Sequence, residues 1–235
     1  MHKVVKAELF KLKRNKAYWF ILLLSFGIYL ALGLMTDEKI SFQDAIASSA
    51  SIVPLFSALV AISVAQADYN DGTMKNVVST GISRTSIYIG KLLAAYIGCM
   101  GIFLIEAIMS VGFSVYGGAT VTMDAFFIIK AVLLQAVVVL NYTVIFFLLG
   151  SIIHIAALAV SLSFAYYLFG AFAFGYVGSF LHISGLADYE LGSVATAIEQ
   201  VNVNTVTMLH LGIVTIIILF FAYIGAFCFN RQEIK

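Results

Sequence analysis

The chain has 235 residues, of which 62% are hydrophobic and 11% are charged, and its formal net charge is +1. Soluble domains are about half apolar and about one-quarter charged, so this composition excludes an ordinary soluble domain and indicates that the lipid bilayer is the solvent. The near-neutral charge, without a basic stripe interleaved with aromatic residues, also argues against a nucleic-acid partner.

The first 16 residues form a basic segment with helical spacing of its apolar residues. Three apolar side chains share one face of this segment: Val5, Leu9 and Leu12. Lysines lie on the rest of the surface and include Lys6, Lys13 and Lys16. This pattern predicts an interfacial helix over residues 1–16 on an anionic membrane surface, and a topology signal alone would explain the same residues.

Runs of about 20 mostly apolar residues, enough to cross about 30 Å of hydrocarbon, recur six times along the chain. We expect transmembrane helices at about residues 18–35, 46–67, 92–116, 126–151, 155–181 and 206–229. The first run is longer than the apolar core of a signal peptide, so we expect an uncleaved signal anchor. Residues 1–235 are therefore predicted to form a single transmembrane domain, all-α and polytopic.

The basic residues predict the orientation, because Lys and Arg concentrate on the cytoplasmic side of membrane proteins. With the N-terminus in the cytoplasm, all 13 basic residues except Lys39 and Lys130 fall in cytoplasmic segments. We therefore expect both termini in the cytoplasm. The connection at 182–205, which carries Asp188 and Glu190, is then an extracellular loop.

The cytoplasmic connection at 67–91 is too long for a simple turn. Asp71 and Gly72 predict a turn, and Thr73 is positioned to cap a short helix. Gly81 is expected to end that helix, and Ser83 to cap the next one.

The short helix in this loop is amphipathic. Its apolar residues share one face: Met74, Val77 and Val78. Its polar residues face elsewhere: Lys75, Asn76 and Ser79. A short helix held beneath the membrane by two spans suits docking into a groove on another protein, whereas resting on lipid is the alternative.

The loop has the form D-Y-x-x-G-T-x-K-x-x-x-S/T-x-x-x-x-R-x-x-x-x-x-x-K. In this form and in the arrangement of its spans, the chain resembles permease subunits of ABC-2 type transporters. The positions that carry the resemblance are Asp68, Gly72, Thr73, Arg84 and Lys91. Many such permeases have Glu where Asp68 stands and Pro where Ile82 stands, and both departures are mild. In its short length, the chain resembles the bacterial permeases that serve bacteriocin and lantibiotic immunity, bacitracin resistance and amphipathic-peptide export. The resemblance therefore implies a bacterial plasma membrane protein.

The resemblance implies that transport and ATP hydrolysis are carried out by different chains. The sequence has no G-x-x-x-x-G-K-S/T phosphate loop, so ATP and Mg would bind a separate ABC ATPase subunit, and this chain would be neither an enzyme nor a cofactor carrier. A second permease subunit, identical or different, would complete the pore. The short helix in the 67–91 loop would then be a coupling helix that contacts the ATPase. The expected ATPase-binding residues in and around it are Asp68, Gly72, Thr73, Met74, Lys75, Val77, Val78 and Arg84.

Polar residues inside spans are costly and are usually paired or face a cavity. Glu106 lies midway along the third span, where it would line the transport path or form a structural hydrogen bond. Gln135 and Asn141 are expected to join helices by hydrogen bonds. The histidines have no metal-ligand spacing, so no metal site is expected. Ala94 and Gly98 would allow another helix to approach closely.

Three classes of function fit a protein of this kind. The first is the permease of an ABC exporter that moves a hydrophobic or amphipathic molecule, such as an antimicrobial or toxin peptide, out of the cell. The second is a gradient-driven secondary transporter or channel, which would favour discontinuous helices and several buried charges. The third, an intramembrane enzyme, lacks support because no G-x-S-x-G or H-E-x-x-H motif is present.

Overall fold

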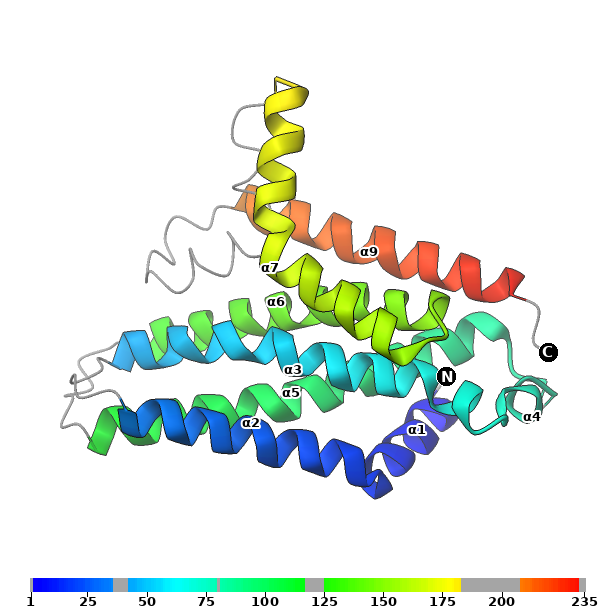
Figure 1. Ribbon diagram of the computed structural model, residues 1–235, viewed down its shortest axis with the longest axis horizontal. Coiled ribbons are helices and arrows are strands. Elements are labelled where there is room, and N and C mark those ends of the chain that lie inside the picture. The colour runs from blue at the N-terminus through cyan, green and yellow to red at the C-terminus, as the bar shows by residue number, and fades with distance from the viewer. Residues whose placement is uncertain (1, 36–41, 80, 117–124, 183–207, 233–235) are drawn as a thin grey trace.

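A computed structural model describes residues 2–35, 42–79, 81–116, 125–182 and 208–232 (Figure 1). These described residues fold into helices and contain no strand. The helices are α1 (His2–Arg14), α2 (Lys16–Met35), α3 (Phe42–Asn70), α4 (Met74–Ser79), α5 (Arg84–Tyr116), α6 (Ala125–Ile152), α7 (Ala156–Phe180) and α9 (Met208–Arg231). The expected outer loop after His182 lies outside the described residues, as do Lys39 and the side chains of Lys130 and His210.

Among the described residues, five helices are long and apolar enough to cross a membrane. Their qualifying segments are Lys16–Met35, Ile52–Asn70, Arg84–Phe113, Val132–Ile152 and Val214–Arg231. Helix α7 has 25 residues, and its apolar stretch Ala156–Gly170 is shorter. The all-α, polytopic membrane fold expected from the sequence is confirmed.

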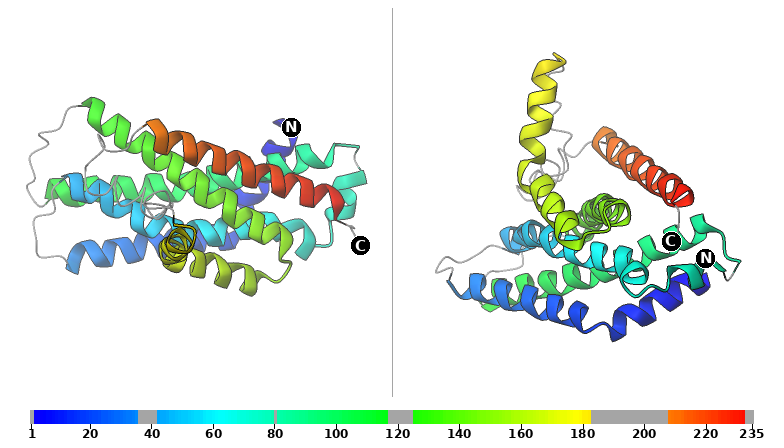
Figure 2. Two further views of the ribbon diagram at one scale, coloured as in Figure 1. Left: turned by 90° about the horizontal axis from the view of Figure 1, so that it is seen from above. Right: turned by 45° about the vertical axis from the view of Figure 1, so that its right-hand side comes forward.

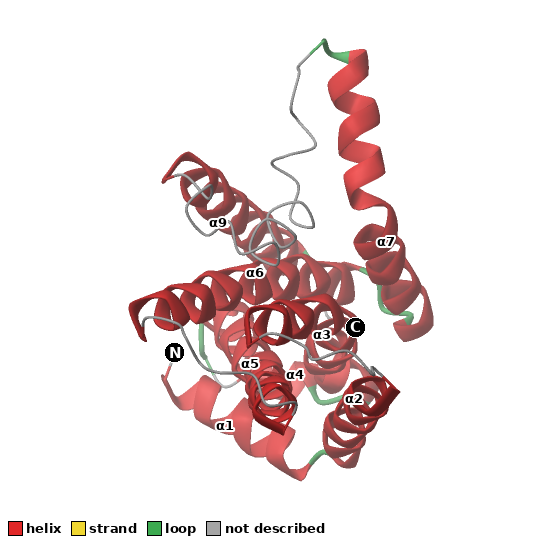
Figure 3. Ribbon diagram, turned by 90° about the vertical axis from the view of Figure 1, so that its left-hand side faces the viewer, coloured by secondary structure: helices red, strands yellow, loops and turns green. Residues whose placement is uncertain are grey.

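The membrane-length helices run along the long axis of the molecule (Figures 1 and 2). Helices α3 and α5 lie in the middle, with α6 on one side and α2 on another, as the end-on view shows (Figure 3). Helix α7 packs against α3 and α6 at its start, and its second half bends away from the bundle. Helix α4 and both ends of the chain lie at one end of the bundle, which we call the α4 end.

An aromatic cluster joins α5, α6 and α9 near the α4 end. The ring centroid of Tyr88 lies 5.2 Å from that of Phe147 and 5.8 Å from that of Phe229. All three side chains are buried. Gly225 makes room for this cluster, because a Cβ atom at that position would collide with the phenol of Tyr88. The outer helix α9 is thus fixed to the centre of the bundle by ring packing.

Small residues at four-residue spacing on α5 receive α1. A Cβ atom added to Gly90 would lie 2.7 Å from a methyl carbon of Val4, and one added to Gly98 would lie 2.8 Å from a methyl carbon of Leu12. Ala94, between the two glycines, is fully buried. The pair of Ala94 and Gly98, which the sequence offered as a surface for another helix, is therefore covered by the chain's own helices.

The buried side of α1 consists of Val4, Glu8 and Leu12. This stripe differs from the expected face, because Val5 and Leu9 are only half-buried. The reason is that α1 packs on α5, so protein contacts and not lipid alone decide its rotation. The lysines expected on the interfacial surface are exposed: Lys6, Lys13 and Lys16.

Gly90→Ala should destabilise the protein, because the new methyl group would push the first turns of α1 away from α5. Overpacking of this kind costs about 1–3 kcal/mol. Gly27→Ala is the matched control, since a Cβ atom at this helical glycine meets nothing within 4 Å. Thermal unfolding in detergent should show a lower midpoint for Gly90→Ala only. Equal midpoints for both variants would contradict the close contact of α1 with α5.

Candidate functional site

Four charged side chains from three helices meet at the α4 end of the bundle. Glu8 and Lys11 come from α1, Asp68 from the last turn of α3, and Lys91 from the second turn of α5. The Lys91 ammonium lies 2.5 Å from an Asp68 carboxylate oxygen and 3.2 Å from one of Glu8. The Lys11 ammonium lies 2.7 Å from Asp68 and 2.8 Å from Glu8. We call these four residues the ion cluster.

The ion cluster is buried and balanced in charge. Glu8, Asp68 and Lys91 are each at most 4% exposed, whereas the Lys11 side chain is 44% exposed. Lys91 donates hydrogen bonds to a Glu8 carboxylate oxygen at 3.2 Å and to the carbonyl of Val64 at 3.5 Å. The two negative charges and the two positive charges of the ion cluster sum to zero. This balance stabilises the cluster, because an unpaired charge is costly to bury.

Lys11 keeps its positive charge in this setting. Burial lowers the pKa of its ammonium, but the hydrogen bonds to Asp68 and Glu8 outweigh burial and leave the pKa above its ordinary value. Lys11 is therefore protonated at neutral pH and holds both carboxylates from the solvent side.

Asp68 also builds the turn that leads to α4. The Thr73 hydroxyl donates to an Asp68 carboxylate oxygen at 3.0 Å, and the Thr73 backbone N–H donates to the Asp68 carbonyl at 2.9 Å. Gly72 has a φ of +64°, a conformation that glycine adopts without strain. Thr73 was expected to cap α4 through its hydroxyl, but that hydroxyl contacts Asp68. The turn, and hence α4, is attached directly to the ion cluster.

Helix α4 packs its apolar side into the chain's own core. Met74 is 3% exposed and belongs to the main hydrophobic cluster, and Val77 and Val78 pack against it half-buried. The expectation that this apolar face is free to enter a partner's groove therefore differs from the structure, because the helix uses it to hold itself beneath the bundle. The surface that α4 leaves exposed is polar: Lys75, Asn76 and Ser79.

The start of α5 is joined to the end of α9. Ser83 caps α5, as expected, by accepting the backbone N–H of Ser86 at 3.3 Å. Arg84 donates to the carbonyls of Asn230 and Gln232 at 3.0 and 2.9 Å, where a cation suits the negative end of a helix. Of the residues in the loop motif, Arg84 thus fastens α9, and Asp68, Thr73 and Lys91 meet at the ion cluster.

The polar residues inside the bundle behave differently from the ion cluster. Glu106 is fully buried, and neither of its carboxylate oxygens has a hydrogen-bond partner among the described residues. Asn141 is also fully buried, and the hydrogen bond between helices expected for its side chain is not formed with any described residue. Gln135 is buried on the same helix, α6. The structural hydrogen bond that was one of the two expectations for Glu106 is therefore not formed with any described residue.

No group of three or more His, Cys, Asp or Glu side chains that could hold a metal ion occurs in the described part of the chain. On the aromatic helix α7, Tyr166 and Tyr167 pack edge-on against Tyr142 of α6. Farther along α7, Phe172 and Tyr176 are exposed. The first half of this helix therefore packs one side against the bundle, whereas the second half presents aromatic rings outward.

The fold and the ion cluster define an all-α polytopic membrane protein in which α1 and the α4 turn are parts of one charged assembly. The sequence pattern of ABC-2 family transporter proteins matches residues 4–170, well over half of the chain. The chain belongs to this family and is the membrane component of a transporter. No curated protein sequence matches it significantly.

The match includes α1, α4 and all four residues of the ion cluster. Sequence reasoning missed Glu8, although a signal was present. Glu8 is the only acidic residue among the first 36 residues, and it lies in a basic segment. A single acid there, one turn from apolar Val4 and Leu12, indicates a buried partner for a cation.

Lys91→Met should strongly destabilise the protein, because it leaves two buried carboxylates opposite Lys11 alone. Removing one partner of a buried pair costs about 3–5 kcal/mol. Adding Glu8→Gln should recover part of this loss, since Asp68 and Lys11 then remain as a balanced pair. Thermal unfolding in detergent measures both variants. A double variant no more stable than Lys91→Met would show that the four charges do not act together.

Glu106→Gln should not lower the unfolding temperature, because no described residue bonds to the carboxylate and the amide has nearly the same shape. Asp68→Asn is the matched control and should lower it, since Asp68 contacts Lys11, Thr73 and Lys91. The same thermal measurement compares the two variants. If Glu106→Gln is as damaging as Asp68→Asn, the Glu106 carboxylate has a structural role.

Proposed function

We propose that this chain is the permease subunit of an ABC exporter that moves a hydrophobic or amphipathic substrate, such as an antimicrobial or toxin peptide, out of a bacterial cell. Family membership supports the permease assignment. The observation that carries the proposed coupling is the attachment of α4 to the ion cluster through Asp68. ATP and Mg bind the partner ATPase and not this chain, and the α4 end faces the cytoplasm with both termini.

The ATPase contacts the polar surface of α4. Lys75, Asn76 and Ser79 are exposed there, together with Asp71 and Gly72 of the preceding turn. Helix α4 projects at the end of the bundle where the chain begins and ends (Figure 1). The buried residues of α4, Met74 above all, hold the helix in position and so affect the ATPase contact indirectly.

Movement of α4 is passed on through Asp68. Thr73 joins the α4 turn to Asp68, and Asp68 is bound to Lys11 of α1 and Lys91 of α5. A displacement of α4 on ATP binding therefore moves the ends of α1, α3 and α5 together. Rigid-body rocking of packed helices is a common way to switch access across a membrane.

A second permease subunit, identical or different, completes the pathway. Apolar residues are exposed along α2, α7 and α9, including Leu23, Phe172 and Tyr223, and they face lipid or the second subunit. Glu106 lines the substrate path in this arrangement, because a buried carboxyl without a described partner is poised to meet a polar group of the substrate.

The gradient-driven transporter remains the second candidate, supported by the same buried carboxyl, which is a feature of ion-coupled transport. An intramembrane enzyme has no such support. A requirement for ATP in transport separates the two transporter classes.

Lys75→Glu should abolish stable co-purification with the ABC ATPase encoded beside the permease gene, because it reverses a charge at the centre of the exposed α4 surface. Lys6→Glu is the matched control, with the same charge reversal on an exposed lysine of α1. We expect loss of at least about tenfold in bound ATPase for Lys75→Glu, the scale of a lost charged contact. Both variants should retain wild-type unfolding temperatures.

Failure of any ATPase to associate with the wild-type protein, in detergent and in lipid nanodiscs, would reject the ABC exporter and favour gradient-driven transport. Equal ATPase binding by Lys75→Glu and wild type would reject the α4 surface as the contact.

A further inference from the structure

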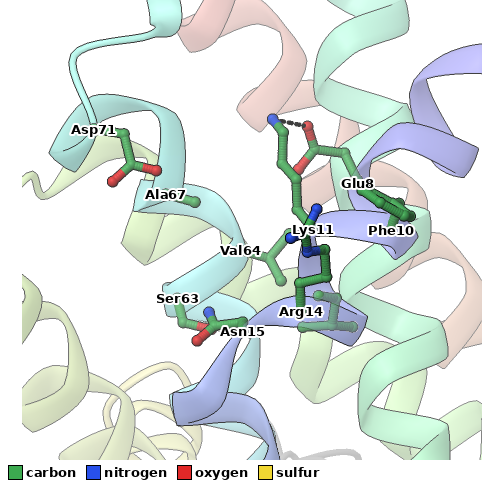
Figure 4. Close-up of a pocket in the computed structure, with 10 residues that line it drawn as sticks. Glu8, Phe10, Lys11, Arg14, Asn15, Ser63, Val64, Ala67 and Asp71 are labelled. Atoms are coloured by element: carbon green, nitrogen blue, oxygen red, sulfur yellow. Dashed lines mark hydrogen bonds and ion pairs between the residues drawn. The ribbon is translucent and has the colours of Figure 1, made fainter.

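A cavity of about 480 Å³ lies between α1 and the end of α3. Its α1 wall includes Lys11 and Arg14, with Asn15 just beyond that helix, and its α3 wall includes Ser63 and Ala67, with Asp71 just beyond α3. Figure 4 shows the two walls facing each other. Ligand sites typically enclose about 300–1,000 Å³, so the cavity is large enough for a small polar group.

The side of the cavity on α1 carries a cation, Arg14, that has no carboxylate partner among the described residues. The Arg14 guanidinium forms no ion pair with any described residue and lies 5.4 Å from the centre of the Phe10 ring. The carboxylate of Glu8, which also lines the cavity, is already bound at both oxygens by Lys11 and Lys91. Because the ion cluster is neutral, Arg14 gives this side of the cavity an excess positive charge.

The α3 wall continues into a strip at membrane depth. Leu55, Leu59, Ser63 and Ala67 follow one another at four-residue spacing and are half-exposed, whereas Val60 and Val64 beside them are buried. This strip is polar or small where it lines the cavity and leucine-rich farther along α3. The change from polar to apolar matches a molecule with a charged head and a hydrocarbon tail.

The cavity is placed where the head groups of one membrane leaflet lie. Helix α1 ends at Arg14 and α2, the first membrane-length helix, begins at Lys16, so the cavity sits at the junction of surface and span. Trp19, which donates to the Lys13 carbonyl at 2.7 Å, marks the same level, since tryptophan favours membrane interfaces.

We propose that this cavity binds a glycerophospholipid of the leaflet in contact with α1, with the lipid phosphate at Arg14 and Lys11 and an acyl chain along Leu59 and Leu55. Asp71 accepts a hydrogen bond from the head group's hydroxyl or amine. Basic pockets between membrane helices are established sites for phospholipid head groups in general. The inference requires only that α1 lies at the membrane surface, so it stands apart from the exporter assignment.

The test is native mass spectrometry of the delipidated protein titrated with phosphatidylglycerol. Arg14→Gln should weaken binding by at least about tenfold, because a charged hydrogen bond to the phosphate is lost. Lys13→Gln is the matched control: it removes the same charge from an exposed neighbour on α1 that does not line the cavity. It should weaken binding by less than about twofold, the effect of diffuse surface charge at low salt.

A second variant tests the cavity without changing charge. Ser63→Leu fills the α3 wall and should weaken phosphatidylglycerol binding as strongly as Arg14→Gln. Its fold should persist, since the Ser63 hydroxyl bonds only to the carbonyl of Val60 in its own helix. Thermal unfolding confirms that each variant is folded before binding is compared.

Four results would overturn the inference. Equal weakening by Arg14→Gln and Lys13→Gln would show diffuse attraction of lipid to α1, and unchanged binding by Ser63→Leu would show that the cavity is not the site. Glycerol 3-phosphate binding as tightly as the lipid would identify a soluble phosphate ligand instead. If the permease alone binds no lipid and Arg14→Gln weakens ATPase binding, the cavity receives the partner protein.

Discussion

Two acidic and two basic side chains form ion pairs where α1, α3 and α5 meet, and the positions of the three helices there depend on these ion pairs. Glu8, Asp68 and Lys91 are buried, so none of them is stable without the others, and Lys11 covers them from the solvent side. The requirement that buried charges be paired therefore fixes the rotation of α1 and the depth of α3 against α5. It also explains why a helix expected to rest on lipid is built into the protein.

The packing of small residues makes the ion cluster possible. Gly90 and Gly98 let Val4 and Leu12 approach α5 closely, which brings Glu8 within reach of Lys91. Asp68 is in turn continuous with the α4 turn through Thr73. The contacts that carry the proposed coupling are thus the same contacts that hold the fold together. In the proposed change of state, these helix ends move as a unit, because separating them would expose unpaired charges.

Two of the buried carboxyl groups, those of Asp68 and Glu106, illustrate a division between structure and function. Asp68 has three side-chain partners and is accounted for by the fold. Neither carboxylate oxygen of Glu106 has a hydrogen-bond partner among the described residues. Natural folds carry such uncompensated groups mainly where a function requires them. The cavity beside α1 presents a similar case on the surface, since Arg14 has no acidic partner among the described residues.

The polytopic all-α fold could be predicted from the hydropathy of the chain, because apolar runs of about 20 residues are long enough to cross the bilayer as helices, which satisfy their own backbone hydrogen bonds in lipid. The resemblance of the loop to ABC-2 permeases also indicated the positions Asp68, Gly72, Thr73, Arg84 and Lys91. Only the tertiary structure decided which way α1 and α4 face, and it placed Val4 and Met74 inside. Helical periodicity gives the faces of a helix but not their neighbours, and Glu8, Asp68 and Lys91 are brought together by packing across long stretches of chain.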